Sequence, residues 1–281
     1  MAGTKRPLGQ DGADASGPID STFGTPLDLN LIGLQTLYLK EVRRFLKVPG
    51  QTLAAPVITT LMFLLIFSLA LGRAGRMVGE VPFLAFLAPG LIMMAIIQNA
   101  FANTSSSVLI AKIQGNIVDL LMPPLRPGEL MLGLVAGGVT RGLLVALAVS
   151  LAMIPFVALV PLHPALILFH AFGGSLMLAL LGLLGGIWAE KFDQMAALTN
   201  FVITPLSFLS GTFYSIAQLP EPFYAIAAIN PFFYLIDGIR FGFTGHADGS
   251  LLLGVAVVVA VDAALWLLAH RLLVRGYRLK A

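Results

Sequence analysis

Cysteine is absent from the 281 residues, so the chain has no disulfide bond, no thiolate nucleophile and no cysteine-bound metal. Charge is scarce as well, because only 11% of the residues are Asp, Glu, Lys or Arg, roughly half the share of an ordinary soluble domain. The net charge is only +3, and the basic residues are spread along the chain near the ends of apolar segments. These shortages exclude a disulfide scaffold and argue against binding to nucleic acid.

The sequence also lacks the short motifs through which many enzymes act. It contains no GxxxxGK[ST] phosphate-binding loop and no HExxH zinc motif. The residues around Ser210 do not form a nucleophile elbow, because no strand precedes them. The four histidines are scattered without a carboxylate at metal-ligand spacing; they are His163, His170, His246 and His270. We therefore expect no catalytic residue, metal or cofactor on this chain.

Apolar residues, by contrast, make up 58% of the chain. A helix needs about 20 consecutive apolar residues to cross a bilayer. Segments of that kind lie at about 53–72, 82–104, 130–154, 164–188, 196–214 and 250–270. The predicted fold class is an all-α integral membrane protein with six transmembrane helices. The polar residues 1–26 predict a disordered cytoplasmic tail, and residues 273–281 predict a basic cytoplasmic tail.

A further apolar region, 219–243, cannot cross the membrane as one straight helix. Prolines and charges interrupt it, among them Pro220, Pro231 and Asp237. Broken backbone at membrane depth survives only where protein buries it. This region therefore predicts a re-entrant helical hairpin before the last span.

Residues 27–48 precede any span and combine an apolar stripe with a basic one. The apolar positions recur at steps of three and four: Leu31, Leu34, Tyr38, Val42 and Phe45. The basic positions are Lys40, Arg43, Arg44 and Lys47. This pattern predicts an amphipathic interface helix, with its apolar side in the lipid and its cations near anionic headgroups. The alternative is a soluble helix that packs on another domain.

The distribution of basic residues predicts the orientation in the membrane. With the N-terminus inside, eleven lysines and arginines lie on cytoplasmic flanks and three, Arg73, Arg76 and Arg240, lie outside. Positive charge accumulates on the cytoplasmic side of membrane proteins. Both termini are therefore expected in the cytoplasm.

Two charges fall inside predicted spans, Arg141 in the third and Asp262 in the sixth. Intramembrane charges are costly and usually face the protein interior or a wet cavity. Both lie at similar depth, so we predict a salt bridge between Arg141 and Asp262. The alternative is that each side chain has a partner of its own.

Polar side chains also recur in the second and fifth spans. The second contains Gln98, Asn99 and Asn103, and the fifth contains Asn200, Thr204 and Ser207 at steps of four and three. Such groups can hydrogen-bond neighbouring helices together. Alternatively, they line a path that opens from the cytoplasm.

A polar segment, residues 105–129, separates the second and third spans. Within it, residues 108–121 predict a short helix that ends before Pro123 and Pro124. On a helical wheel, Lys112, Asn116 and Asp119 share one face. This face is either a surface on which another protein pushes or part of a solvated helix that only joins two spans.

Two stretches resemble the permease subunit of ABC-2 type transporters, the bacterial group that includes drug, polysaccharide and lipo-oligosaccharide exporters. They are KIQGNIVDLLMPPLRPGELMLG at 112–133 and LSGTFYSIAQLPEPFYAIAAINPFFYLIDGIRFGFTG at 209–245. The resemblance extends over 27–272, which would form one ABC-2 type transmembrane domain. The double proline at 123–124 departs from the single proline that is commoner in that family.

The resemblance implies a homodimer in the bacterial inner membrane that docks on two copies of a separate ATPase, which binds ATP and magnesium. The helix at 108–121 would be the coupling helix, with Lys112, Asn116 and Asp119 facing the ATPase. The region 211–243 would form an extracellular cap. The second and fifth spans would line the substrate path. The outer gate would include Phe213, Tyr214, Asn230, Pro231 and Tyr234.

The function expected from these features is that of an exporter subunit. It would move a hydrophobic, lipid-linked or glycan substrate out of the cytoplasm by alternating access. One alternative is a proton-coupled secondary transporter that uses Asp262. Another is an integral-membrane lipid enzyme, for which the sequence offers no convergent acid, base and nucleophile.

The coupling assignment can be tested by charge reversal. Asp119→Lys and Lys112→Glu are expected to leave membrane insertion intact but to weaken docking or stimulation of the ATPase, because they invert charges on the proposed contact face. ATP hydrolysis by the purified complex measures this effect. Normal stimulated hydrolysis in both variants would contradict the assignment.

Overall fold

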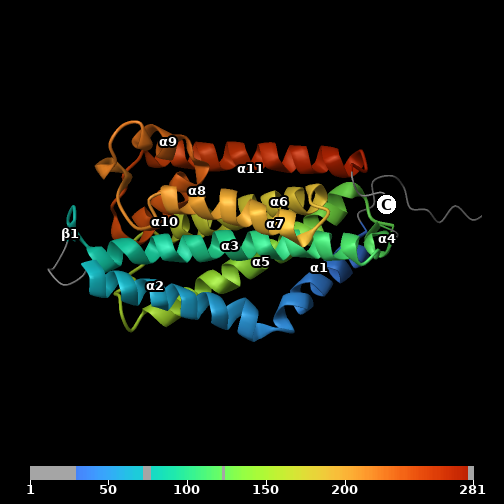
Figure 1. Cartoon of the computed structure of the whole chain (residues 1–281), viewed down its shortest axis with the longest axis horizontal. Coiled ribbons are helices and arrows are strands. Elements are labelled where there is room, and N and C mark those ends of the chain that lie inside the picture. Colours follow the sequence, from blue (N-terminus) through green and yellow to red (C-terminus); the bar gives the residue numbers. More distant parts are fainter. Residues whose placement is uncertain (1–29, 72–76, 122–123, 278–281) are drawn as a thin grey trace, which may run out of the picture.

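The computed structural model describes residues 30–71, 77–121 and 124–277. These residues form an elongated bundle of helices whose long axes run nearly along the molecule (Figure 1). A small antiparallel hairpin, β1 (Met77–Val78) and β2 (Val81–Pro82), lies at one end of the bundle. The all-α prediction therefore holds for the bundle itself.

Five helices in the described part are long and apolar enough to cross a membrane. They are α2 (Ala55–Leu71) with the π-helical turn η1 (Gly50–Ala54) before it, α3 (Phe83–Ile113), α5 (Pro127–Met153), α6 (Pro164–Trp188) and α11 (Leu251–Val274). The predicted fourth span, 164–188, coincides with α6. The first, third and sixth predicted spans agree with α2, α5 and α11 to within a few residues, whereas α3 continues nine residues beyond the predicted end at 104.

The predicted fifth span, 196–214, is not among these five helices. It corresponds to three short elements that follow one another, α7 (Phe192–Leu198), the π-helical η3 (Thr199–Ile203) and α8 (Thr204–Leu209). Pro205 lacks an amide proton for the preceding turn, and Gly211 has a positive φ of 77° just after the segment ends. A sixth membrane crossing therefore remains a prediction.

The interrupted region after α8 forms short helices, as expected. It contains η4 (Ile216–Gln218), α9 (Phe223–Ile229) and α10 (Pro231–Thr244), and α9 and α10 are separated at Asn230. The Asn230 side chain accepts a hydrogen bond from the Phe232 amide and donates to the Leu206 carbonyl and the Ser210 hydroxyl. One asparagine thus begins α10 and ties it to α8. Whether this hairpin re-enters the bilayer remains a prediction.

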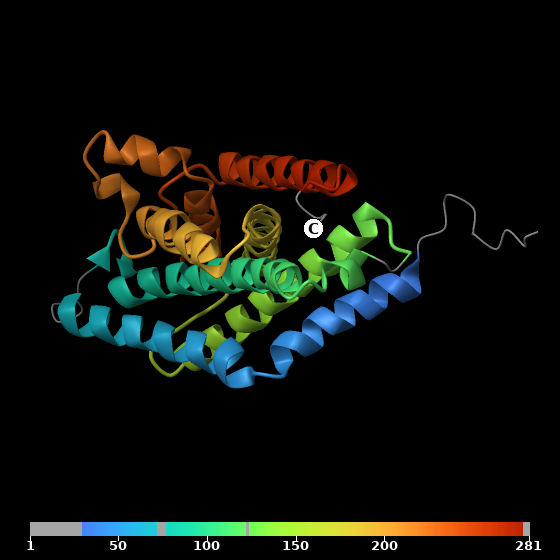
Figure 2. The ribbon, with the colours of Figure 1, turned by 45° about the vertical axis from the view of Figure 1, so that its right-hand side comes forward.

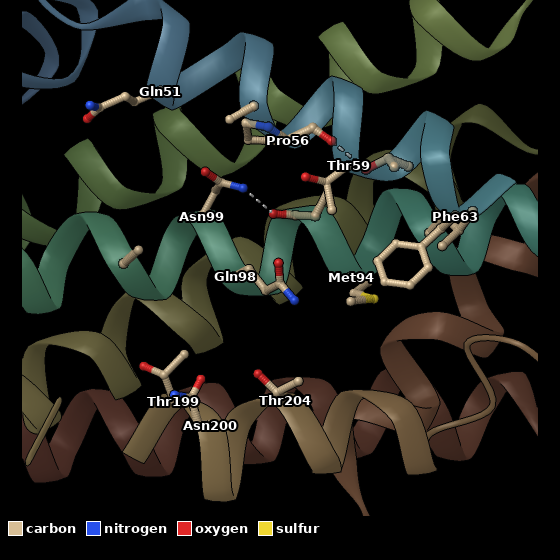
Figure 3. A pocket seen from close by; sticks show the side chains of 15 residues that line it. Gln51, Pro56, Thr59, Phe63, Met94, Gln98, Asn99, Thr199, Asn200 and Thr204 are labelled. Atoms are coloured by element: carbon tan, nitrogen blue, oxygen red, sulfur yellow. Dashed lines mark hydrogen bonds between the residues drawn. The ribbon is translucent and has the colours of Figure 1, made fainter. Parts of the chain in front are cut away.

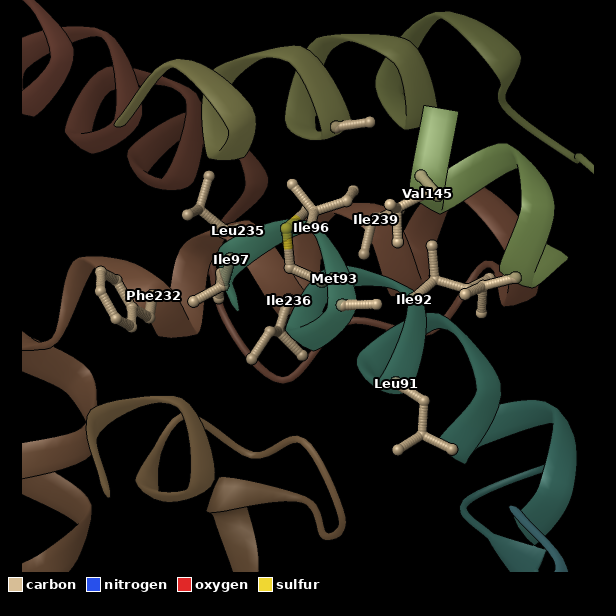
Figure 4. Close-up of a cluster of buried hydrophobic side chains, with 14 of the residues drawn as sticks. Leu91, Ile92, Met93, Ile96, Ile97, Val145, Phe232, Leu235, Ile236 and Ile239 are labelled. Carbon is tan, nitrogen blue, oxygen red and sulfur yellow. The ribbon is translucent and has the colours of Figure 1, made fainter. Parts of the chain in front are cut away.

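Helix α3 is the centre of the bundle, and α5, α6, α10 and α2 pack around it. Of its most apolar 18 residues, 83% are buried, against 11% in both α2 and α11. Figure 4 shows Met93 and Ile96 of α3 beside Leu235 and Ile239 of α10. The two most exposed spans therefore lie at the periphery, where lipid or another chain can cover them.

The α3–α6 contact is close because glycine leaves room for the facing backbone. A Cβ atom at Gly182 would lie 2.5 Å from the Phe101 carbonyl oxygen. Close approach of this kind is how helices associate in lipid, where apolar burial gives no advantage over contact with acyl chains.

Helix α1 (Leu31–Leu46) packs on α5, so part of the apolar stripe that was predicted to lie in lipid contacts protein instead. Its buried residues are Leu37, Glu41 and Phe45, whereas Leu31 of the predicted apolar stripe is 66% exposed. Glycines on α5 let the buried face of α1 approach closely, because a Cβ at Gly133 would lie only 2.7 Å from Leu37. The helix therefore has its main apolar contact with protein.

Gly182→Ala should lower the free energy of unfolding by about 1–3 kcal/mol, because the added methyl group meets a backbone oxygen that cannot move alone. Gly50→Ala is the matched control, since a Cβ added at Gly50 would have no described atom within 4 Å. Thermal unfolding of both variants in one detergent measures the difference. Equal melting temperatures would show that α3 and α6 are not packed this closely.

Candidate functional site

A cavity of about 420 Å³ lies on one side of α3, between η1 and α2 on one flank and η3 and α8 on the other (Figure 3). Its apolar lining includes Phe63, Leu91 and Met94, and none of the described residues that line it is charged. The polar lining consists of amides and hydroxyls: Gln51, Thr59, Thr60, Gln98, Asn99, Thr199, Asn200 and Thr204. The cavity can therefore hydrogen-bond to uncharged polar groups beside an apolar surface.

Four of the predicted path residues line this cavity: Gln98, Asn99, Asn200 and Thr204. The other two do not. Asn103 is fully buried and accepts a hydrogen bond from Arg44, and Ser207 donates to the Ile203 carbonyl. Of the two residues outside the cavity, Asn103 therefore connects α3 to α1, whereas Ser207 bonds within its own segment.

Sequence reasoning missed the contribution of the first span to this cavity. Gln51, Thr59 and Thr60 project from η1 and α2, and Thr60 also donates to the Pro56 carbonyl. The signal was a polar stripe in an otherwise apolar segment, like the stripes recognised in the second and fifth spans. The cavity is thus bordered by three segments that are distant in sequence.

The predicted salt bridge between Arg141 and Asp262, both of which the structure describes, is absent. The ion pairs Glu41–Arg44 and Asp248–His246 include neither Arg141 nor Asp262. Arg141 Nη2 donates to Asn99 Oδ1 at 3.0 Å, so α5 presents this guanidinium to α3. Asp262 on α11 instead faces α6, where a Cβ at Gly173 would lie 3.6 Å from its Oδ2. The two charges thus have different neighbouring helices despite similar depth.

An ion pair within α1, between Glu41 and Arg44, is hydrogen-bonded to the second half of α3. Glu41 is only 1% exposed, accepts from Arg44 Nη2 at 2.9 Å and accepts from the Ser107 hydroxyl at 2.7 Å. Arg44 also donates to the Asn103 carbonyl at 2.7 Å and to the Ser106 hydroxyl at 3.1 Å. Arg44 therefore has its hydrogen-bond partners in the protein, although the sequence pattern grouped it with the headgroup cations.

The predicted coupling helix at 108–121 is wrong as a single element. Helix α3 continues to Ile113, a turn with Gly115 at φ 72° follows, and α4 (Ile117–Leu121) has only five residues. Glycine at a positive φ ends a helix readily. Lys112 on one side of this turn and Asn116 and Asp119 on the other therefore do not share a helical face.

Lys112 fastens the end of α3 to the end of α6. Its Nζ donates to the carbonyls of Ile187 at 2.8 Å and Ala189 at 2.7 Å. A cation at the carbonyl end of a helix is favourable. Lys112→Glu would place a carboxylate against these oxygens, so Asp119→Lys is the variant that reports on docking.

The predicted gate residues lie in two groups. Phe213 stacks on Phe67 at 4.7 Å and lies 5.7 Å from Phe63, which lines the cavity. The other four lie around α8, α9 and α10, where Tyr214 donates to the Leu209 carbonyl and Tyr234 to the Ala228 carbonyl. Asn230 and Pro231 form the start of α10. Their role as a gate remains a prediction.

Arg240, which the charge distribution placed on the outer side, is fully buried. Its guanidinium lies 3.8 Å from the centre of the Phe86 ring and donates to the Gly211 carbonyl. It therefore connects α10, α3 and the loop after α8. The described residues contain no group of three or more histidines or carboxylates that could hold a metal ion.

Comparison with known proteins identifies the family. A sequence profile described as ABC-2 type transporter matches residues 33–244, most of the chain. The chain belongs to the ABC-2 type transporter family. This ABC-2 permease is 38% identical over 259 residues to the inner membrane transport permease YadH of Escherichia coli K12, covering 91% of this chain and 100% of the relative. It is 30% identical over 217 residues to nodulation protein J of Rhizobium leguminosarum bv. viciae, covering 75% of this chain and 82% of the relative.

Gln98 and Asn99 are neighbouring amide side chains on α3 of the ABC-2 permease, and they differ in their hydrogen bonds. Asn99→Leu removes the hydrogen-bond partner of the half-buried Arg141 and should cost about 1–3 kcal/mol of stability. Gln98→Leu should leave stability unchanged, because Gln98 has no hydrogen bond to another described residue. Thermal unfolding in detergent compares them. A melting temperature that falls equally in both variants would remove this distinction.

Proposed function

We propose that this ABC-2 permease is the membrane subunit of an ATP-driven exporter that moves a hydrophobic, lipid-linked or glycan substrate out of the cytoplasm. Two copies would pair as a homodimer and dock on two copies of a separate ATPase, which binds ATP and magnesium. Family membership supports the partnership, since ABC-2 permeases generally work with an ATPase subunit. The name of the YadH relative supports location in a bacterial inner membrane.

The uncharged cavity carries the proposal. Its amides and hydroxyls can replace the water that a sugar, amide or carbonyl group loses on entry, and Phe63 and Met94 offer contact to an apolar group. An isolated charge would lose its hydration there without gaining a counter-charge. Within the proposed substrate range, an amphiphile with a neutral polar headgroup suits this site best.

The exposed side of the cavity supports pairing with a second copy. Phe201, next to Asn200 on η3, is 81% exposed, and α2 exposes Ile66. In a homodimer these apolar side chains would meet a partner permease, and the cavity would lie near the interface. Tight packing of such surfaces, more than burial from water, drives association in a bilayer.

Helix α3 supports the transmission of force between the ATPase side and the cavity. It runs unbroken from Gln98 to Lys112, which corresponds to about 21 Å at 1.5 Å per residue. Helix α3 thus connects the cavity to the turn before α4 as a single rigid element. Alternating access requires two discrete arrangements of the spans, and displacement of α3 would link them to the ATPase.

A proton-coupled secondary transporter is the second candidate, and one observation favours it. Asp262 is 9% exposed, and its Oδ1 has no hydrogen-bond partner among the described residues. An unpaired carboxyl group in a span is a potential proton site. Asp262→Asn separates the candidates, because it would abolish proton-coupled transport and leave ATP-driven transport intact.

The decisive experiment is mild detergent purification of the tagged chain from its native host. An ATPase subunit should co-purify, and the reconstituted complex should hydrolyse ATP. A neutral diacyl glycolipid with a disaccharide headgroup should stimulate hydrolysis, and a quaternary ammonium lipid with the same chains should not. Gln98→Leu and Asn200→Leu should each raise the stimulating concentration about fivefold, the effect of one lost hydrogen bond.

Gln218→Leu is the matched control for these variants, because Gln218 is an exposed amide on η4 that does not line the cavity. A permease that purifies alone in repeated trials, without ATP hydrolysis, would overturn the exporter proposal. A complex that responds equally to both lipids would retain the exporter and reject the preference for a neutral headgroup.

A further inference from the structure

Three cations share the outward face of α1. Lys40, Arg43 and Lys47 recur at steps of three and four, which places them on one side of a helix, and all three are exposed. Together with Thr36, Leu39 and Arg44 they line a surface hollow of about 560 Å³. The opposite side of α1 is committed to α5 and α3, so this face is the one left for an external partner.

No described carboxylate neutralises these cations. Neither ion pair in the described ranges includes Lys40, Arg43 or Lys47. The one carboxylate of α1, Glu41, is buried on the other face and bonded to Arg44 and Ser107. The hollow therefore has three positive charges available for an anion.

The hollow lies where the chain enters the membrane. Lys47 is three residues before Gly50, where the first candidate span begins, and Lys40 is about 11 Å further along α1. Figure 2 shows α1 and α2 meeting at an angle at this point. The interfacial layer beside the hydrocarbon core contains the phosphates of the lipids. The three cations are therefore at the height of the headgroups.

We propose that this hollow binds the headgroup of an anionic phospholipid. Lysine and arginine donate charge-assisted hydrogen bonds to phosphate oxygens, and the acyl chains would continue along the exposed apolar side of α2, which includes Ile58 and Leu65. An acidic protein surface would match the charge, but it would not match this continuation from basic to apolar surface. The proposal goes beyond the exporter function and needs neither an ATPase nor a substrate.

Binding of phosphatidylglycerol to the full-length chain in detergent tests this site by native mass spectrometry. The triple variant Lys40→Gln, Arg43→Gln, Lys47→Gln should bind about a hundredfold more weakly, since each basic residue at an anionic membrane contributes about fivefold. The charge-conserving triple Lys40→Arg, Arg43→Lys, Lys47→Arg should bind nearly as the wild type. Phosphatidylcholine with the same chains should bind weakly to all three proteins.

A second control removes three exposed cations elsewhere, Lys191→Gln, Arg271→Gln and Arg275→Gln. It should retain phosphatidylglycerol, which would exclude an effect of net charge alone. Equal binding by the wild type and the first triple variant would overturn the proposal. So would full competition by inorganic phosphate, which would indicate a site for a free anion. Loss of a co-purifying protein with retained lipid binding would assign the hollow to that protein instead.

Discussion

Close backbone contact between α3 and α6 is the constraint on which the rest of the bundle depends. In lipid, helices gain little from burying apolar surface, so they must gain from dense packing. Gly182 supplies this against Phe101, and Gly138 and Gly142 of α5 do the same against Thr104 and Ser175. With α3 enclosed in this way, α2 and α11 remain outside, and the cavity can form only on the side of α3 that α5 and α6 do not cover.

Polar groups on α3 are used in two ways because of this enclosure. Asn99 and Asn103 point toward partners on α5 and α1, where Arg141 and Arg44 need hydrogen-bond acceptors. Gln98 points toward the cavity and makes no hydrogen bond to another described residue. Helix α3 thus binds its neighbours through Asn99 and Asn103 and presents Gln98 and Asn99 to the cavity.

The sequence was sufficient where a local property decides the structure. The limits of α6 follow from apolar length and from Pro164 at its first turn, and the break at Asn230–Pro231 follows from proline. The sequence was insufficient where contacts with other helices decide the position of a side chain. The partner of Arg141 depends on how α5 is rotated against α3, and the burial of Glu41 depends on glycines nearly a hundred residues away. For the same reason the sequence anticipated four residues that line the cavity, but not the contribution of α2.

The two π-helical turns, η1 and η3, border the cavity on opposite flanks, with Gln51 on one and Thr199 and Asn200 on the other. A π-helical turn contains one more residue per hydrogen-bonded ring than an α-helical turn and is less stable. Conversion of either turn to α-helix shortens its circumference and rotates every side chain beyond it. The width of the cavity can therefore change when η1 or η3 converts to α-helix, while α3 and the packed core behind it keep their positions.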